Sequence, residues 1–167
     1  MRKMTEENMK AAFAGESQAH TRYLIFAEEA KRHGFENVAR LFTAIAFAEL
    51  VHATNHLRAL GGIGKTSENL AKAIEGETFE VDEMYPAYVE VAKLQEEKLA
   101  ERSATWALEA EKIHAEMFRK AKEAVEAGKD AEIGDIYICE VCGYTVEGEP
   151  PDRCPICNAA KERFRKF

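Results

Sequence analysis

The sequence predicts a mainly α protein, in which a four-helix bundle is followed by a small C-terminal domain folded around a metal. Apolar residues recur at helical spacing over most of the chain before residue 130. A Glu-x-x-His motif occurs twice within these stretches, at Glu49–His52 and Glu111–His114. All four cysteines stand near the C-terminus, in two Cys-x-x-Cys pairs. These observations divide the chain into a helical domain, residues 1–132, and a metal-knuckle domain, residues 133–167.

The first two helices are predicted from apolar stripes that end at glycines. Thr5 is a candidate cap for a helix that continues to Gly34. The second helix is expected to begin near Glu36 and to end at Gly61 and Gly62.

The third helical region contains residues that usually interrupt a helix. A short helix capped at Ser67 is expected to stop at Gly76, and a third long helix is expected to start at Glu77. Pro86 lies inside that stretch, so a kink or a late helix start is predicted there.

The fourth helix is predicted from the apolar stripe between residues 104 and 125, and Gly128 marks its end. The turn before it is expected at Gln95–Glu97, although neither glycine nor proline stands there. After Ile133 the amino-acid composition changes, and residues 136–138 are predicted to form a short strand.

An internal repeat relates the two halves of the helical part. Gly15–Glu16 recurs 61 residues later as Gly76–Glu77, and Ala48–Ala53 recurs 62 residues later as Ala110–Ala115. Two helix pairs with the same polar insertions predict a pseudo-symmetric bundle in which those insertions face each other.

The polar insertions have the composition of a metal site. A carboxylate inside an apolar stripe costs several kcal/mol unless something compensates for it. A single Glu-x-x-His motif would more often be structural, because the chain has 30 acidic residues and most are solvated. Two such motifs, with one glutamate from each of the other helices, form the ligand set of di-iron bundles. The expected ligands are Glu16, Glu49, His52, Glu77, Glu111 and His114, with Glu80 as one carboxylate more.

Further polar residues lie near these ligands. Tyr23 and Tyr85 follow Glu16 and Glu77 by about two turns. Core packing is the default role for such tyrosines, and hydrogen bonding to a ligand carboxylate is the sharper alternative. His20 and His56 have no counterpart in the repeat, so a structural or supporting role is expected.

The four cysteines, Cys139, Cys142, Cys154 and Cys157, can surround one tetrahedral metal. Such thiolate sites hold iron or zinc, and the spacing alone does not distinguish them. In a reducing compartment clustered cysteines are more often metal ligands than disulfides.

The charge and the N-terminus limit the partners and the location. The net charge is −7 and the isoelectric point is about 5.4, which argues against nucleic acid as a partner. The sequence contains no apolar stretch of about twenty residues, so no membrane span is predicted. The first residues have no apolar signal core, so a cytoplasmic protein is expected.

Taken together, these motifs resemble the rubrerythrin family. The likeness covers nearly the whole chain and follows the order of the family's motifs. It rests on Gly15–Ala19, Glu49–Ala53, Gly76–Glu80, Glu83–Pro86, Glu111–His114 and the four cysteines.

The resemblance implies a ferritin-like di-iron bundle followed by a rubredoxin-like domain with one iron held by four cysteines. It implies reduction of hydrogen peroxide to water, in defence against oxidative stress. Electrons would come from NAD(P)H through a separate reductase or a carrier such as rubredoxin. A homodimer is expected, and helices are exchanged between subunits in some relatives.

The resemblance also implies residue roles. Glu49 and Glu111 would bridge the two irons, and Glu16, Glu77 and His114 would be terminal ligands. One iron would exchange Glu80 for His52 between oxidation states, so these two residues and the tyrosines Tyr23 and Tyr85 are the catalytic candidates. Two alternatives stay open. One is a ferroxidase or iron-handling protein, and the other is a non-catalytic protein with a structural zinc knuckle.

Overall fold

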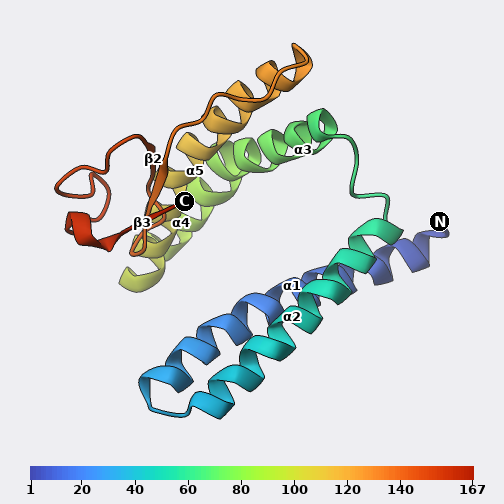
Figure 1. Ribbon diagram of the computed structural model, residues 1–167, viewed down its shortest axis with the longest axis horizontal. Coiled ribbons are helices and arrows are strands. Elements are labelled where there is room, and N and C mark those ends of the chain that lie inside the picture. The colour runs from blue at the N-terminus through green and yellow to red at the C-terminus, as the bar shows by residue number, and fades with distance from the viewer. The chain divides into compact units, whose positions relative to one another are not determined.

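The computed structural model describes every residue from Met1 to Phe167. The chain divides into two compact units, Met1–Gly64 and Lys65–Phe167. The first contains two long helices, and the second contains the remaining helices and a small sheet (Figure 1). The mainly α fold class with a small cysteine-containing C-terminal region is therefore confirmed.

The first unit is a hairpin of α1 (Lys3–Arg32) and α2 (Glu36–Ala59). The chain reverses at Gly34, whose positive φ of 79° suits a residue without a Cβ. Just after it, the Phe35 N–H donates to the Ala30 carbonyl at 2.9 Å, which closes the end of α1. The most buried side chains of the hairpin are alanines: Ala27, Ala30, Ala39, Ala46 and Ala53.

The start of α1 differs from the prediction. The helix begins at Lys3, with Arg2 in extended backbone before it and no side-chain cap. Thr5 therefore lies inside the first turn rather than at the cap. Helix ends fray, and three further residues extend the helix without a capping hydroxyl.

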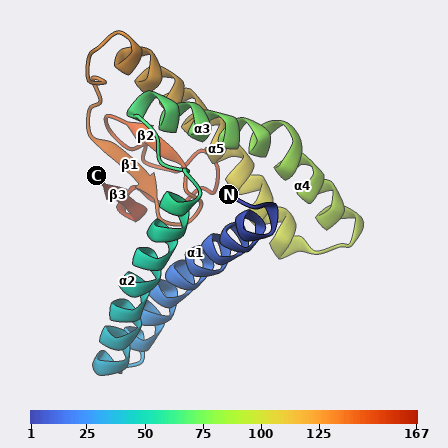
Figure 2. The same cartoon turned by 90° about the vertical axis from the view of Figure 1, so that its right-hand side faces the viewer.

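The helices of the second unit are α3 (Thr66–Phe79), a π-helical turn η1 (Glu80–Met84), α4 (Tyr85–Leu94) and α5 (Lys98–Glu126). Both α3 and α4 pack against α5 (Figure 2). The predicted helix stop at Gly76 is wrong, because α3 continues through this residue. Glycine in a helix interior costs roughly 1 kcal/mol relative to alanine, and packing against α5 can offset a cost of that size.

The interruption predicted near Pro86 takes the form of the π-helical turn η1. Pro86 is the second residue of α4, directly after this turn, and has no N–H to donate to the preceding helical turn. The Tyr85 N–H bonds the Glu80 carbonyl five residues before it, as in a π-helix. The turn predicted at residues 95–97 is confirmed, since α4 ends at Leu94 and α5 begins at Lys98. Glu96 has a φ of 59° there, a left-handed conformation adopted without glycine.

The C-terminal region is a three-stranded antiparallel sheet in the order β2-β1-β3. The strands are β1 (Ile136–Cys139), β2 (Thr145–Glu147) and β3 (Phe164–Lys166), and a short 3₁₀ turn η2 (Lys161–Arg163) precedes β3. Ile138 pairs with Thr145, and Cys139 pairs with Phe164. Strand β2 contacts α5. With so small a core, this region is expected to depend on a bound metal for its stability.

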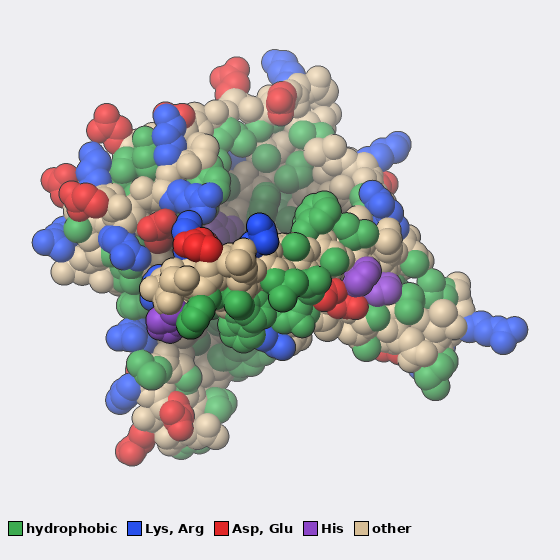
Figure 3. All heavy atoms as spheres, turned by 60° about the horizontal axis from the view of Figure 1, so that its bottom comes forward, with side chains coloured by type: hydrophobic (Ala, Val, Ile, Leu, Met, Phe, Trp, Pro, Cys, Tyr) green, Lys and Arg blue, Asp and Glu red, His purple; other side chains and the backbone are tan.

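Large apolar side chains are exposed on both units. They include Phe26, Leu41 and Phe47 of the hairpin, and Tyr88 and Leu94 of α4. Figure 3 shows hydrophobic side chains at the surface close to histidine and acidic side chains. The helices bury mainly alanine and leave larger apolar groups uncovered, so each unit retains surface suited to further packing. No helix combines the length and the apolarity needed to cross a bilayer.

Candidate metal centres

The hairpin of α1 and α2 brings together Glu16, Glu49 and His52. One ligand atom from each lies within 4.8 Å of the others. His52 Nδ1 is 2.8 Å from Glu49 Oε2 and 3.8 Å from Glu16 Oε1. Glu49 and His52 are one turn apart on α2, so they share a helical face that is turned toward Glu16 of α1.

The second unit forms an equivalent cluster from Glu77 of α3 with Glu111 and His114 of α5. Their ligand atoms also lie within 4.8 Å of one another, and His114 Nδ1 is 2.6 Å from Glu111 Oε2. Glu77 Oε2 is buried and has no hydrogen-bond partner. Burial, followed by the adjacent Glu111 carboxyl, raises the pKa of Glu77 to about 7.

These features fit a divalent cation. A buried carboxylate oxygen without a donor is costly, and a cation would satisfy it. Carboxylate oxygen and imidazole nitrogen are the donors that bundle di-iron sites use. The repeat therefore corresponds to two matching three-residue clusters, one in each unit of the chain.

Glu80 lies outside both three-residue clusters. It begins the π-helical turn, one residue after the end of α3. Burial and the charge of Glu77 raise its pKa, while His114 acts in the opposite direction. Burial, and then the charges of Glu80, Glu111 and Glu77, raise the pKa of Tyr85, so this residue lies near the same carboxylates. Both residues thus adjoin the second cluster.

The candidates of the first hairpin have different surroundings. The Tyr23 ring packs against Phe42 with 6.0 Å between the ring centroids, in agreement with the packing role. His20 Nδ1 lies 2.7 Å from the Ala46 carbonyl and donates to it, which ties α1 to α2. His20 therefore has the structural role expected of it.

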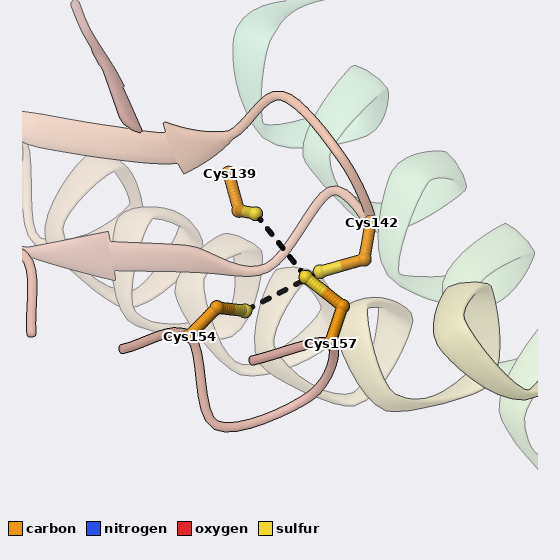
Figure 4. A group of neighbouring side chains, drawn as sticks. All are labelled: Cys139, Cys142, Cys154 and Cys157. Carbon is orange, nitrogen blue, oxygen red and sulfur yellow. Dashed lines mark hydrogen bonds between the residues drawn. The ribbon is translucent and has the colours of Figure 1, made fainter. Parts of the chain in front are cut away.

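The four cysteine side chains converge from the ends of two loops (Figure 4). The sulfur atoms of Cys139 and Cys157 are 3.6 Å apart, and those of Cys142 and Cys154 are 3.5 Å apart. A tetrahedron with metal–sulfur bonds of about 2.3 Å has edges of about 3.8 Å. The thiols are therefore arranged with nearly the spacing that a tetrahedral metal requires.

The two cysteine loops have the same backbone geometry. The N–H of Gly143 donates to the Cys139 carbonyl, and the N–H of Asn158 donates to the Cys154 carbonyl, each at 2.9 Å. The residue after the second cysteine of each loop has a positive φ, 82° at Gly143 and 62° at Asn158. Asparagine thus adopts the left-handed conformation expected of it in place of glycine.

The protonation of the thiols depends on their surroundings. Burial raises the pKa of the Cys142 thiol. Burial acts in the same direction on Cys154, but the backbone N–H groups of Cys157 and Ile156 outweigh it, and the pKa is lowered. Adjacent buried thiols cannot all ionise without a cation, so the site favours a metal that binds four thiolates.

The cysteine domain reaches the second carboxylate cluster directly. Thr145 Oγ1 is 2.8 Å from His114 Nε2, and the same hydroxyl donates to the Gly143 carbonyl at 3.0 Å. Only 5% of Thr145 is exposed. Nothing in the sequence marks this residue, because no spacing rule relates a strand threonine to a histidine 31 positions before it.

Comparison with known proteins identifies both parts of the chain. The family model described as Rubrerythrin matches residues 7–122, and the model described as rubrerythrin, rubredoxin-like domain, matches residues 137–165. Rubrerythrin-2 of Clostridium acetobutylicum is 46% identical over 98% of this chain and 97% of its own length. Nigerythrin of Nitratidesulfovibrio vulgaris is 34% identical over 98% of this chain and 86% of its own length.

Solved structures give the same result. A nigerythrin structure in a mixed-valence state has a TM-score of 0.54 and 35% identity, and the match covers 98% of this chain and 86% of that chain. A structure of nigerythrin in the fully reduced, all-ferrous state matches equally well.

Proposed function

We propose that this chain, which belongs to the rubrerythrin family, reduces hydrogen peroxide to water and takes up electrons at its four-cysteine site. Members of the family carry a di-iron centre and a rubredoxin-like iron and act generally in oxidative stress. The overall reaction consumes one peroxide, two protons and two electrons and yields two water molecules.

The proposal assigns each group of residues a task. The four cysteines would hold one iron, and the two carboxylate–histidine clusters, with Glu80, would hold the other two. Iron at these sites would supply one-electron oxidation and reduction. The chain itself must orient the peroxide and deliver protons to the departing oxygen.

Glu80 and Tyr85 are the candidate proton donors. Both adjoin the second cluster, and burial is the first cause of the raised pKa of each. The raised pKa keeps the Glu80 carboxyl protonated closer to neutral pH, where it can donate, whereas it makes the Tyr85 phenol a weaker acid, so Glu80 is the stronger candidate. For this role, the Glu80 carboxyl must come within hydrogen-bond distance of a peroxide oxygen.

The observation that supports the proposal best is the contact between the two kinds of site. The cysteine domain meets the carboxylate cluster of the same unit through Thr145 and His114. An iron-storage protein needs no site of electron entry beside its carboxylates. A structural knuckle needs no contact with a metal ligand.

The visible spectrum of the iron-loaded protein tests this function. The protein is reduced under anaerobic conditions, and hydrogen peroxide is then added without dioxygen. We expect the red ferric band of the cysteine site to return within the time of turnover. A cysteine site that stayed reduced while peroxide disappeared would refute electron entry there.

Two further observations, the colour of the protein as isolated and its oxidation by dioxygen, address the alternatives. A colourless protein would indicate zinc at the cysteines and favour the structural reading. Faster oxidation by dioxygen than by peroxide, under matched conditions, would favour a ferroxidase. We propose the cytoplasm as the location, and an NAD(P)H-dependent reductase, with or without a rubredoxin, as the electron source.

We further propose that the active form is a homodimer in which the two kinds of three-residue cluster complete one another. Each cluster supplies three ligand residues, fewer than the set of a two-metal bundle. The exposed apolar side chains of both units would be covered by this packing.

Complementation distinguishes exchange of helices between chains from packing within one chain. Glu16→Ala disables the first cluster and Glu77→Ala disables the second. If the chains exchange helices, a mixed dimer of the two variants regains one complete site. If each chain packs on itself, every site keeps one defect, and co-refolding restores no activity.

A further inference from the structure

We propose that Thr145 is a positioning residue that fixes the ring of His114, so that Nδ1 faces the carboxylates of the second cluster. The inference rests on the proposed function only for its catalytic consequence. Its structural basis is a buried hydroxyl of the cysteine domain between a backbone carbonyl and the imidazole of a candidate ligand.

The direction of the hydrogen bonds follows from the chemistry of the three groups. A carbonyl only accepts, so Thr145 must donate its single hydroxyl proton to the Gly143 carbonyl. The hydroxyl then has only lone pairs left for His114. Nε2 of His114, 2.8 Å away, must therefore carry a proton and donate it.

The proton on Nε2 determines what the other nitrogen can do. In the neutral ring Nδ1 then carries the lone pair and can only accept, so the proton in its 2.6 Å contact with Glu111 Oε2 belongs to the carboxyl group, in the place that a bound cation would take. A metal-binding histidine is usually held in this way by a hydrogen bond to its other ring nitrogen. Carboxylates, carbonyls and water are the usual acceptors, and here a threonine hydroxyl has that position.

The equivalent histidine of the repeat lacks this domain-derived anchor. The side chain of His52 is 53% exposed, whereas that of His114 is 27% exposed. The repeat makes their helical positions equivalent, but β2 of the cysteine domain packs on α5. Thr145 thereby makes the two histidines different, with His114 held and His52 freer to move.

A pair of substitutions at one position tests the hydroxyl. Thr145→Val keeps the shape of the side chain and removes the hydroxyl, whereas Thr145→Ser keeps the hydroxyl and removes the methyl group. Thr105→Val is the control, because Thr105 is an exposed threonine of α5 that bonds only its own helix. The absorption of the ferric cysteine site verifies that each variant is folded.

The first readout is the rate of release of ferrous iron from the carboxylate site to a chelator. Loss of a supporting hydrogen bond to a metal-bound histidine typically weakens affinity by 10–100-fold. We expect Thr145→Val to release iron at least about tenfold faster, and Thr145→Ser and Thr105→Val to resemble the unsubstituted protein. Equal rates in all four proteins would overturn the inference.

The second readout is the nitrogen NMR spectrum of the zinc-loaded, full-length protein, and it does not depend on any variant folding. His114 should show a slowly exchanging proton on Nε2, with a nuclear Overhauser contact to the Thr145 methyl group. A proton on Nδ1 instead would overturn the inference. A failed peroxidase assay with these signals present would refute the proposed function and leave the role of Thr145 intact.

Discussion

The Glu77 carboxyl is expected to destabilise the metal-free protein at neutral pH, and Glu77→Gln should relieve this. One of its oxygens is buried without a partner, and burial raises its pKa from 4.5 to about 7. In the unfolded chain the same carboxyl ionises at its ordinary pKa. Folding at pH 8 therefore requires an ionised carboxylate in a site that disfavours the charge.

The sign and the pH range follow from this difference. Below pH 4.5 the carboxyl is protonated in both states, so it has no effect on stability. Between 4.5 and 7 the folded state binds more protons than the unfolded state, and the free energy of unfolding falls as the pH rises. Above pH 7 the loss is complete and stays constant.

The size of the effect follows from the shift. Each pKa unit corresponds to about 1.4 kcal/mol, so the full shift would correspond to about 3 kcal/mol. Solvent reaches part of this carboxyl and screens it, which reduces the expected value to about 1–2 kcal/mol. With a urea dependence of about 2 kcal/mol per molar, the unfolding midpoint of Glu77→Gln should rise by about 0.5–1 M at pH 8.

The assay is urea unfolding of protein freed of metal at the carboxylate site, at pH values from 4 to 8. Glu75→Gln is the matched control, since Glu75 is an exposed residue of the same helix. Adding ferrous iron should reverse the sign, because an amide is a poorer ligand than a carboxylate. If the difference in unfolding midpoint between Glu77→Gln and the unsubstituted protein were the same at every pH, the reasoning would be refuted.

Three further substitutions test other parts of the molecule. Glu80→Ala should slow peroxide turnover at least about tenfold, in the range typical of proton-transfer groups, with a smaller loss of iron. Glu83→Ala is the control, because Glu83 is exposed. Full activity of Glu80→Ala would contradict the ligand exchange. Cys142→Ser should remove the red absorption and speed amide hydrogen exchange in β1, β2 and β3, while the amides of α1 and α2 stay protected. Unchanged protection in the strands would show that the domain folds without its metal. Asn158→Val should destabilise the cysteine domain by about 1–2 kcal/mol, because residue 158 has a φ of 62°. Asn158→Gly should change the stability of this domain by less than about 1 kcal/mol. Equal thermal stability of the two variants would mean that this backbone conformation is not under strain.

Short-range patterns in the sequence were sufficient for much of the secondary structure. The end of α5 before Gly128 and the first strand were predicted, since each depends on local preferences. The turn at residues 95–97 was also predicted, although no glycine or proline marks it. The same patterns failed where packing overrides preference. Gly76 continues a helix that lies against α5, although glycine is expected to end a helix.

The sequence by itself determined which residues form the metal-binding chemistry of this protein. The repeat and the cysteine pairs specify ligand types and their spacing along helices and turns, and those spacings fix which side chains share a face. Only the tertiary structure decided which residues of distant segments meet. The hydrogen bond from His114 to Thr145 depends on how β2 packs on α5, and such a contact has no period along the chain that could reveal it.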